Sequence, residues 1–188
     1  ARVLIPGVGL HYQLMPAASV FFGIHKGFAP PSAELYQKPE SSVNMELGTR
    51  VAIGNFRAEL IGFYNNYSNM LGSHSWGNVV RGDEIPYIFK HALNMQLGIE
   101  CKWFYANIGA RYNSDMRTSP GQGTIAEREK VPANLIFDAS LNVFVNKYLT
   151  VRLNAINLTN RVYLTSRHPA GLRAGHPFGI YAGANVQF

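Results

Sequence analysis

Phe178-Gly-Ile-Tyr-Ala-Gly-Ala-Asn-Val-Gln-Phe188 is the stretch that decides the fold of this 188-residue chain. Its apolar residues occupy every second position, and Gly, Tyr, Asn and Gln lie between them. Because the side chains of a strand alternate between two faces, this pattern predicts a strand with one apolar and one polar face. The termini of soluble domains usually fray, whereas a transmembrane β-barrel strand keeps an apolar lipid face and a polar lumen face. The alternation runs through to Phe188 and therefore favours a transmembrane β-barrel.

The same period of two recurs along the chain, and no stretch repeats apolar residues at the helical spacing over three turns. We predict an all-β chain, a transmembrane antiparallel β-barrel with about nine strands in this sequence. The expected strands cover residues 3–14, 20–25, 43–51, 56–70, 93–100, 106–113, 137–143, 149–155 and 178–188.

The connections between the expected strands alternate in length. Short turns lie at residues 15–18, 54–55, 101–103 and 146–147, and long segments lie at 27–42, 71–86, 114–132 and 159–176. Outer-membrane barrels have short periplasmic turns at one end and long extracellular loops at the other. If Phe188 lies at the periplasmic end, all four long segments face the outside of the cell.

The composition agrees with a barrel and excludes several other classes. Charged residues make up 15% of the chain, and no apolar run approaches the roughly 20 residues of a membrane helix. The net charge is +6, but there is no basic helix and no nucleic-acid motif, so we expect no nucleic acid partner. Cys101 is the only cysteine, which excludes an internal disulfide.

Four segments then occur in a recognisable order. Gly27-Phe-Ala-Pro-Pro31 follows an apolar strand, and Glu46-Leu-Gly-Thr-Arg50 comes downstream; Asn157-Leu-Thr-Asn160-Arg-Val-Tyr163 and the loop Pro169-Ala-Gly-Leu-Arg-Ala-Gly-His-Pro177 precede the last strand. In this order they resemble the carboxy-terminal barrel portion of TonB-dependent outer-membrane receptors. The loop from Arg167 to Gly175 is most similar to that of ferric dicitrate and siderophore receptors.

The resemblance implies that the chain is part of a larger barrel, whose many strands cross the bacterial outer membrane. Residues 1–188 would be the carboxy-terminal part of the barrel domain, with the plug domain and the segment that contacts TonB outside this sequence. A nine-stranded arc with unpaired edges is unstable in lipid, and receptors with about 22 strands around a plugged lumen supply the missing partners. We expect this sequence to begin inside a longer one.

The implied function is an outer-membrane receptor that takes up an iron chelate, ferric citrate or a siderophore, with energy supplied through TonB. The chelate would be the transported ligand, and no cofactor is implied. Other expected partners are outer-membrane lipid and lipopolysaccharide. One departure from the family is the segment from Gly72 to Glu84, which is too short for the further hairpin expected there.

Basic residues of the last loop are the best candidates for ligand binding. No acidic residue occurs from Thr159 to His176, and guanidinium groups suit carboxylate oxygens in paired hydrogen bonds. A basic loop also suits lipopolysaccharide phosphates, or simply faces water. The candidate ligand-binding residues are Arg167, His168, Arg173 and His176, with Arg81 and Arg117 from other loops.

Other functions find less support in the sequence. There is no Gly-x-Ser-x-Gly elbow and no other catalytic motif, so we expect no enzyme, and the isolated His74 predicts no metal site. The alternative from another class is a small non-transporting outer-membrane β-barrel with a structural or adhesion role. That alternative requires an even strand count, most simply eight, and a closed lumen filled by polar side chains.

Overall fold

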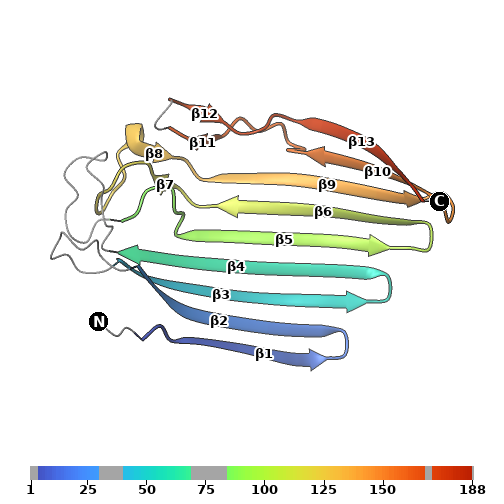
Figure 1. Ribbon diagram of the computed structural model, residues 1–188, viewed down its shortest axis with the longest axis horizontal. Coiled ribbons are helices and arrows are strands. Elements are labelled where there is room, and N and C mark those ends of the chain that lie inside the picture. The colour runs from blue at the N-terminus through green and yellow to red at the C-terminus, as the bar shows by residue number, and fades with distance from the viewer. Residues whose placement is uncertain (1–3, 30–39, 69–83, 168–170, 188) are drawn as a thin grey trace.

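The computed structural model describes residues 4–29, 40–68, 84–167 and 171–187. A single antiparallel sheet of nine strands, in the order β1-β2-β3-β4-β5-β6-β9-β10-β13, dominates it (Figure 1). Its strands are β1 (Gly7–Met15), β2 (Ala18–Ala29), β3 (Glu40–Ile53), β4 (Phe56–Ser68), β5 (His91–Glu100), β6 (Phe104–Asn113), β9 (Asn134–Phe144), β10 (Leu149–Ile156) and β13 (Gly179–Val186). The nine predicted strands are confirmed, and each pairs with its neighbours in the chain order expected.

Several predicted boundaries were wrong. β1 begins at Gly7 rather than at residue 3, directly after Pro6, which lacks the N–H needed for ladder pairing. β2 and β3 extend into the segment predicted as a loop, and pair as far as Ala29 and Glu40. Two segments predicted as plain loops hold small pairs of strands: β7 (Met116–Arg117) with β8 (Lys130–Val131), and β11 (Leu164–Ser166) with β12 (Arg173–Ala174).

The strand register separates the side chains into two faces. Leu10, Phe22, Leu47, Leu93 and Tyr112 lie in one row across the sheet, with Gly62 between Leu47 and Leu93. The row on the opposite face holds Gln13, Ser19, Arg50, Glu59 and Gln96. Since apolar rows alternate with polar rows, the sheet has the faces predicted for a lipid-facing and a lumen-facing wall.

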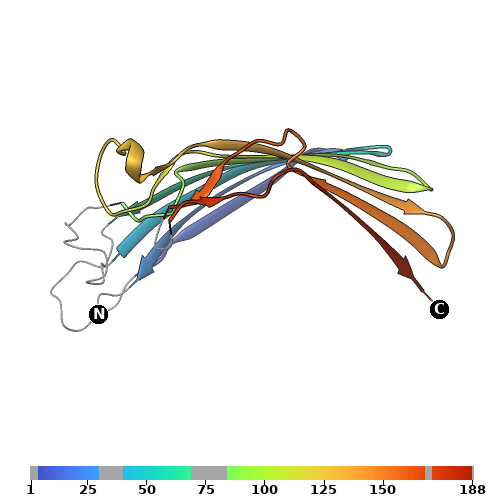
Figure 2. The same cartoon turned by 90° about the horizontal axis from the view of Figure 1, so that it is seen from above.

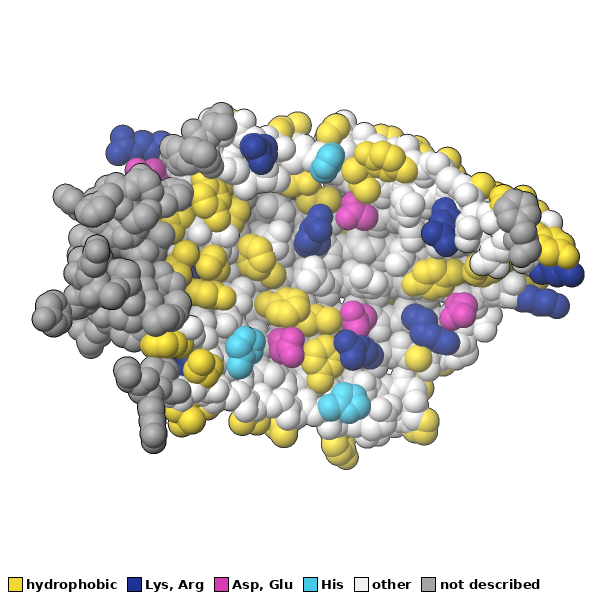
Figure 3. Space-filling model, viewed as in Figure 1, with side chains coloured by type: hydrophobic (Ala, Val, Ile, Leu, Met, Phe, Trp, Pro, Cys, Tyr) yellow, Lys and Arg dark blue, Asp and Glu magenta, His cyan; other side chains and the backbone are white. Residues whose placement is uncertain are grey.

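The sheet is a curved arc rather than a closed barrel (Figure 2). Figure 3 shows its inner face, over which basic, acidic and histidine side chains are scattered. Within the described residues, β1 and β13 each pair on one side only, so both edges of the sheet are open. The short turns lie at one end and the long connections at the other, as the sequence predicts (Figure 1).

β4 pairs directly with β5 along nine consecutive positions, from Phe56 opposite Ile99 to Tyr64 opposite His91. The sheet therefore continues without a gap where the sequence comparison with the family suggested a missing hairpin. The pairing also keeps both strands in the sheet, so the eight-stranded alternative is not what the described residues form.

Helix is almost absent from the described part of the chain, where the one helical element is a 3-10 turn, Glu127–Glu129. Among these residues, no helix has the length and apolar character needed to cross a membrane.

Candidate functional site

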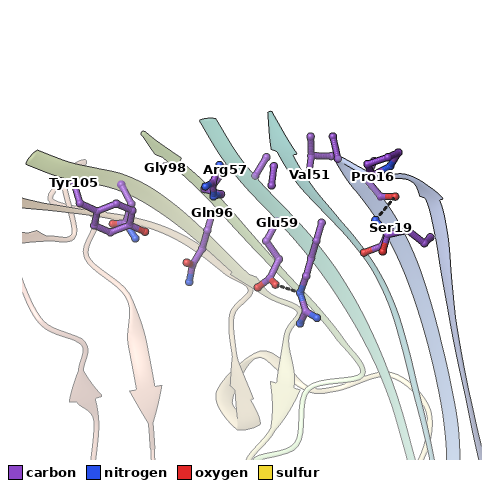
Figure 4. A pocket seen from close by; sticks show the side chains of 15 residues that line it. Pro16, Ser19, Val51, Arg57, Glu59, Gln96, Gly98 and Tyr105 are labelled. Carbon is purple, nitrogen blue, oxygen red and sulfur yellow. Dashed lines mark hydrogen bonds and ion pairs between the residues drawn. The ribbon is translucent and has the colours of Figure 1, made fainter. Parts of the chain in front are cut away.

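The inner wall near the short turns is polar and carries paired charges. Arg50 Nε donates to Glu59 Oε2 at 2.5 Å, and the Arg50 guanidinium lies 4.6 Å from the centre of the Phe21 ring. The Phe21 ring covers Gly48 so closely that a Cβ at this position would lie 2.2 Å from it. Arg50, Glu59, Gln96 and other polar residues line a cleft of about 340 Å³, in which Glu59 and Gln96 point to the inner side of the arc (Figure 4).

A larger cavity of about 540 Å³ lies on the inner face at the end of the sheet that bears the long loops. Asn94, Arg111, Asn113 and Asn134 of the sheet line it together with residues of the loops. Phe89, Met116, Val131, Tyr163 and Leu164 are among its loop residues. Arg111 has a single acidic neighbour among the described residues, Asp138, at a long 4.0 Å, so the cavity combines amides, one guanidinium and apolar groups.

The connections β4–β5 and β6–β9 are joined by a buried arginine. Arg117 is only 5% exposed, and its Nε donates to Glu84 Oε2 at 2.9 Å while its Nη2 donates to the carbonyl of Gly123 at 3.0 Å. Lys90 Nζ lies 2.5 Å from the other oxygen of Glu84. The backbone supports the same contact, because Tyr87 N–H donates to Arg117 O and Glu84 N–H donates to Gly121 O.

The Glu84 carboxylate has two cationic partners, and they determine its protonation. Burial alone would raise the pKa of Glu84, but the hydrogen bonds and charges of Lys90 and Arg117 outweigh burial and hold this pKa below its ordinary value of 4.5. A lowered folded pKa stabilises the loop contact above pH 4.5, and this contribution is lost as the pH falls through the folded pKa.

We therefore expect an NMR titration of the Arg117 Nε–H resonance to report a midpoint below 4.5. Glu84→Gln should abolish this transition, because the variant has no charge to lose. A wild-type midpoint at or above 4.5 would show that the cations do not dominate the environment of Glu84.

The last long connection, β10–β13, contacts the β6–β9 connection through another arginine. Arg167 Nε donates to the backbone carbonyl of Lys130 at 2.7 Å. Tyr163 packs under Gly175, where an added Cβ would lie 2.0 Å from the ring, and Gly175 N–H donates to Tyr163 O at 2.8 Å. Only glycine at position 175 leaves space for this ring.

Asn157 closes the base of the same connection. It is 1% exposed and adopts a φ of 49°, a left-handed conformation that Asn tolerates better than most residues. Its Nδ2 donates to the carbonyls of Arg161 and His176 at 2.9 and 2.8 Å, and its Oδ1 accepts from Arg161 N–H at 2.9 Å. Asp138 Oδ1 accepts from Asn157 N–H at 2.8 Å, which ties the connection to β9.

The predicted ligand-binding residues fall into three groups. Arg173 and His176 are exposed on the last connection. Arg167 and Arg117 are engaged with the protein itself, as described above. His168 and Arg81 lie outside the described residues.

Sequence reasoning did not single out Arg111, Glu84 or Asn157 as site residues. Arg111 lines the 540 Å³ cavity, Glu84 holds Arg117, and Asn157 shapes the loop that carries Arg173 and His176. Asn157 belongs to a motif that the sequence shows, but two of its hydrogen-bond partners, Asp138 and His176, lie 19 residues away from it. Among the described residues, no three His, Cys, Asp or Glu side chains are grouped closely enough to hold a metal ion.

Comparison with known proteins agrees with this architecture. Residues 2–83 match the family described as TonB dependent receptor-like, beta-barrel. A search of curated proteins returned no match.

Solved structures match almost the whole chain. The siderophore receptor PiuA from Acinetobacter baumannii superposes with a TM-score of 0.73 at 16% identity, over 97% of this chain and 28% of its own. The FrpB iron transporter from Neisseria meningitidis superposes with a TM-score of 0.72 at 15% identity, over 98% of this chain and 31% of its own. The ferric citrate transporter FecA in the unliganded form superposes with a TM-score of 0.59 at 15% identity, over 98% of this chain and 38% of its own.

The chain thus spans roughly a third of the length of these solved receptors, from 28% to 38%. At such identities the likeness concerns the fold. Residues 2–83 match the TonB dependent receptor-like β-barrel family, and the nine-stranded sheet of the chain has the fold of a part of such barrels.

Proposed function

We propose that this chain is the carboxy-terminal part of the barrel domain of a bacterial outer-membrane receptor that takes up an iron chelate. Energy is supplied through TonB, which acts on parts of the receptor outside this sequence. Receptors of this family are transporters rather than enzymes and reside in the outer membrane, so we assign no reaction to the chain. Each of the three solved structures compared above is described as an iron or siderophore receptor or transporter.

The observation that carries the proposal is the pair of faces on an open sheet. An apolar outer face suits hydrocarbon, and a polar inner face with charges of both signs suits a lumen. An unpaired strand edge in lipid leaves backbone groups that cost several kcal/mol each, so β1 and β13 require further strands. A small barrel formed by these nine strands alone has no further strands to pair with β1 and β13, and this favours the larger receptor over the non-transporting alternative.

The loops at the other end supply the groups that would meet a chelate. Arg173 and His176 are exposed in a segment without acidic residues, and the cavity lined by Arg111 and four asparagines lies on the inner face at the same end. Ferric citrate and siderophores with carboxylate or catecholate oxygens both suit such donors. Binding of ferric citrate and of ferric siderophores to the full polypeptide, measured by fluorescence quenching or calorimetry, tests the proposal.

Reversal of the loop charge should weaken binding of an anionic chelate. We expect Arg173→Glu to lower affinity roughly fivefold and to flatten its dependence on salt, since an exposed charge pair contributes up to about 1 kcal/mol. Lys147→Glu makes the same charge change as Arg173→Glu in a short turn at the opposite end of the sheet, and should leave affinity unchanged. Equal affinity in Arg173→Glu and the wild type would exclude a ligand role for Arg173.

A further inference from the structure

Hydrogen bonds between described residues link three of the long connections to one another. The first link is an anchor on β4, where Asn65 N–H donates to Lys90 O at 2.8 Å and Asn65 Nδ2 donates to Phe89 O at 3.3 Å. Lys90 in turn pairs with Glu84, so the described part of the β4–β5 connection, residues 84–90, is held at both of its ends.

Arg117 provides the second link, from Glu84 to the β6–β9 connection. Its guanidinium reaches both Glu84 and the carbonyl of Gly123, which places it between two connections rather than at the surface of one. Nη1 lies 2.7 Å from where a Cβ would stand on Gly121, so a larger residue at 121 would displace the guanidinium. The Arg117 side chain is 6% exposed and that of Glu84 is 28% exposed, so the pair is shielded from solvent on the arginine side and its loss costs more than loss of a fully exposed pair.

The third link crosses the β6–β9 connection itself. Thr118 is fully buried, and its N–H and its Oγ1 both donate to Glu129 O, at 2.8 and 3.0 Å. The next residue after Glu129 is Lys130, whose carbonyl accepts from Arg167 Nε. The β10–β13 connection that carries Arg167 is anchored in turn by Asn157 at its base.

We infer that Arg117 is a positioning residue that joins these three connections into one mechanical unit, the loop rim, around the cavity that Arg111 lines. The rim runs from the Asn65 anchor on β4 through Glu84, Arg117 and Lys130 to Arg167. A change in one connection is then transmitted to the others, because contiguous packed and hydrogen-bonded groups carry coupling between sites. Arg117 and Arg167 thereby act through the shape of the rim rather than by contact with a ligand.

This inference deepens the proposed function, in which the rim surrounds the chelate, but its test requires no chelate. We would follow amide hydrogen exchange by NMR or mass spectrometry in the full polypeptide in detergent micelles. Arg117→Met should accelerate exchange roughly tenfold or more at Tyr87, which donates to Arg117 O, and also at Gly175 in the β10–β13 connection. Arg128→Met is the matched control, because Arg128 lies in the β6–β9 connection with a side chain that is 87% exposed, and it should change neither amide.

Acceleration at Tyr87 with unchanged exchange at Gly175 would overturn the inference, because the disturbance would then be local. If Arg117→Met does not fold, Arg167→Met serves instead, since it removes one hydrogen bond at the far end of the rim. It should accelerate exchange of Thr118 N–H, and an unchanged rate at Thr118 would overturn the inference equally. Accelerated exchange at both amides, in a protein that binds no iron chelate, would support the coupling of the loop rim and reject the proposed function.

Discussion

Asn157→Ala is expected to lower the free energy of unfolding by about 3 kcal/mol. The variant removes two donors and one acceptor from a site that is 1% exposed, so the carbonyls of Arg161 and His176 lose their shared partner. Alanine is also less tolerant than asparagine of the left-handed conformation at this position. Urea titration of the folded protein in micelles, monitored by tryptophan fluorescence or heat-modifiable gel mobility, measures the effect.

Two further variants distinguish the loss of the Asn157 hydrogen bonds from the loss of an asparagine side chain in general. Asn154→Ala makes the same change at an exposed position of β10, and should stay within about 0.5 kcal/mol of the wild type. Asn157→Asp keeps an acceptor for Arg161 N–H but cannot donate to either carbonyl, so it should be about as unstable as the alanine variant. Equal stability of Asn157→Ala and Asn154→Ala would show that Asn157 does not hold the last connection together.

Leu97→Arg is expected to destabilise the folded protein in a bilayer by about 2 to 4 kcal/mol. Leu97 lies in the middle of β5 on the apolar face, in a row with Ala58 and Ile108. An arginine there would place a charge in hydrocarbon near the bilayer midplane. Folding into lipid vesicles at increasing urea concentration measures the cost.

The neighbouring residue supplies the control for the face assignment. Gln96 lies beside Glu59 and lines the inner cleft, so Gln96→Arg should cost less than about 1 kcal/mol because its charge faces the polar wall. A neutral Leu97→Arg together with a costly Gln96→Arg would mean that the two faces of the sheet have been assigned the wrong way round.

The long strands could be predicted from the sequence because their signal is local. A period of two over eight or more residues gives both the element and its faces, and Gly54-Asn55 marks a tight turn in which Gly54 has a φ of 54°. The four small strands could not be predicted in this way. β7, β8, β11 and β12 are two or three residues long, which is too short to show any period.

Apolar residues on the polar face show a second limit to what the alternation of apolar and polar residues can predict. Ile136 lies in a row with Asn94 and Arg111, yet it is 2% exposed. Val131 of the β6–β9 connection, which lines the neighbouring cavity, is 1% exposed, so loop residues and wall residues are buried together at this end. A strand pattern alone does not reveal that a loop returns to cover the wall.

The candidate site was predicted only by residue type and charge. Arg117 and Arg173 carry the same group in loops of similar polarity, but Arg117 is buried against Glu84, which precedes it by 33 residues, and Arg173 is exposed. The acidic partner decides which arginine is available, and that pairing arises only when the two connections meet. Asn157 is similar, because the motif marks its position while His176, 19 residues away, explains its role.

The most direct test of the proposed receptor is the intact mass of the polypeptide that carries this sequence, isolated from the outer membrane of its native cell. The chain itself has a mass of 20.9 kDa and spans 28% to 38% of the solved receptors compared above. We expect a membrane-embedded polypeptide of roughly three times 20.9 kDa, which supplies the strands that the edges of β1 and β13 require. A polypeptide of about 20.9 kDa would contradict this expectation, because no further strands would then be available to close the barrel.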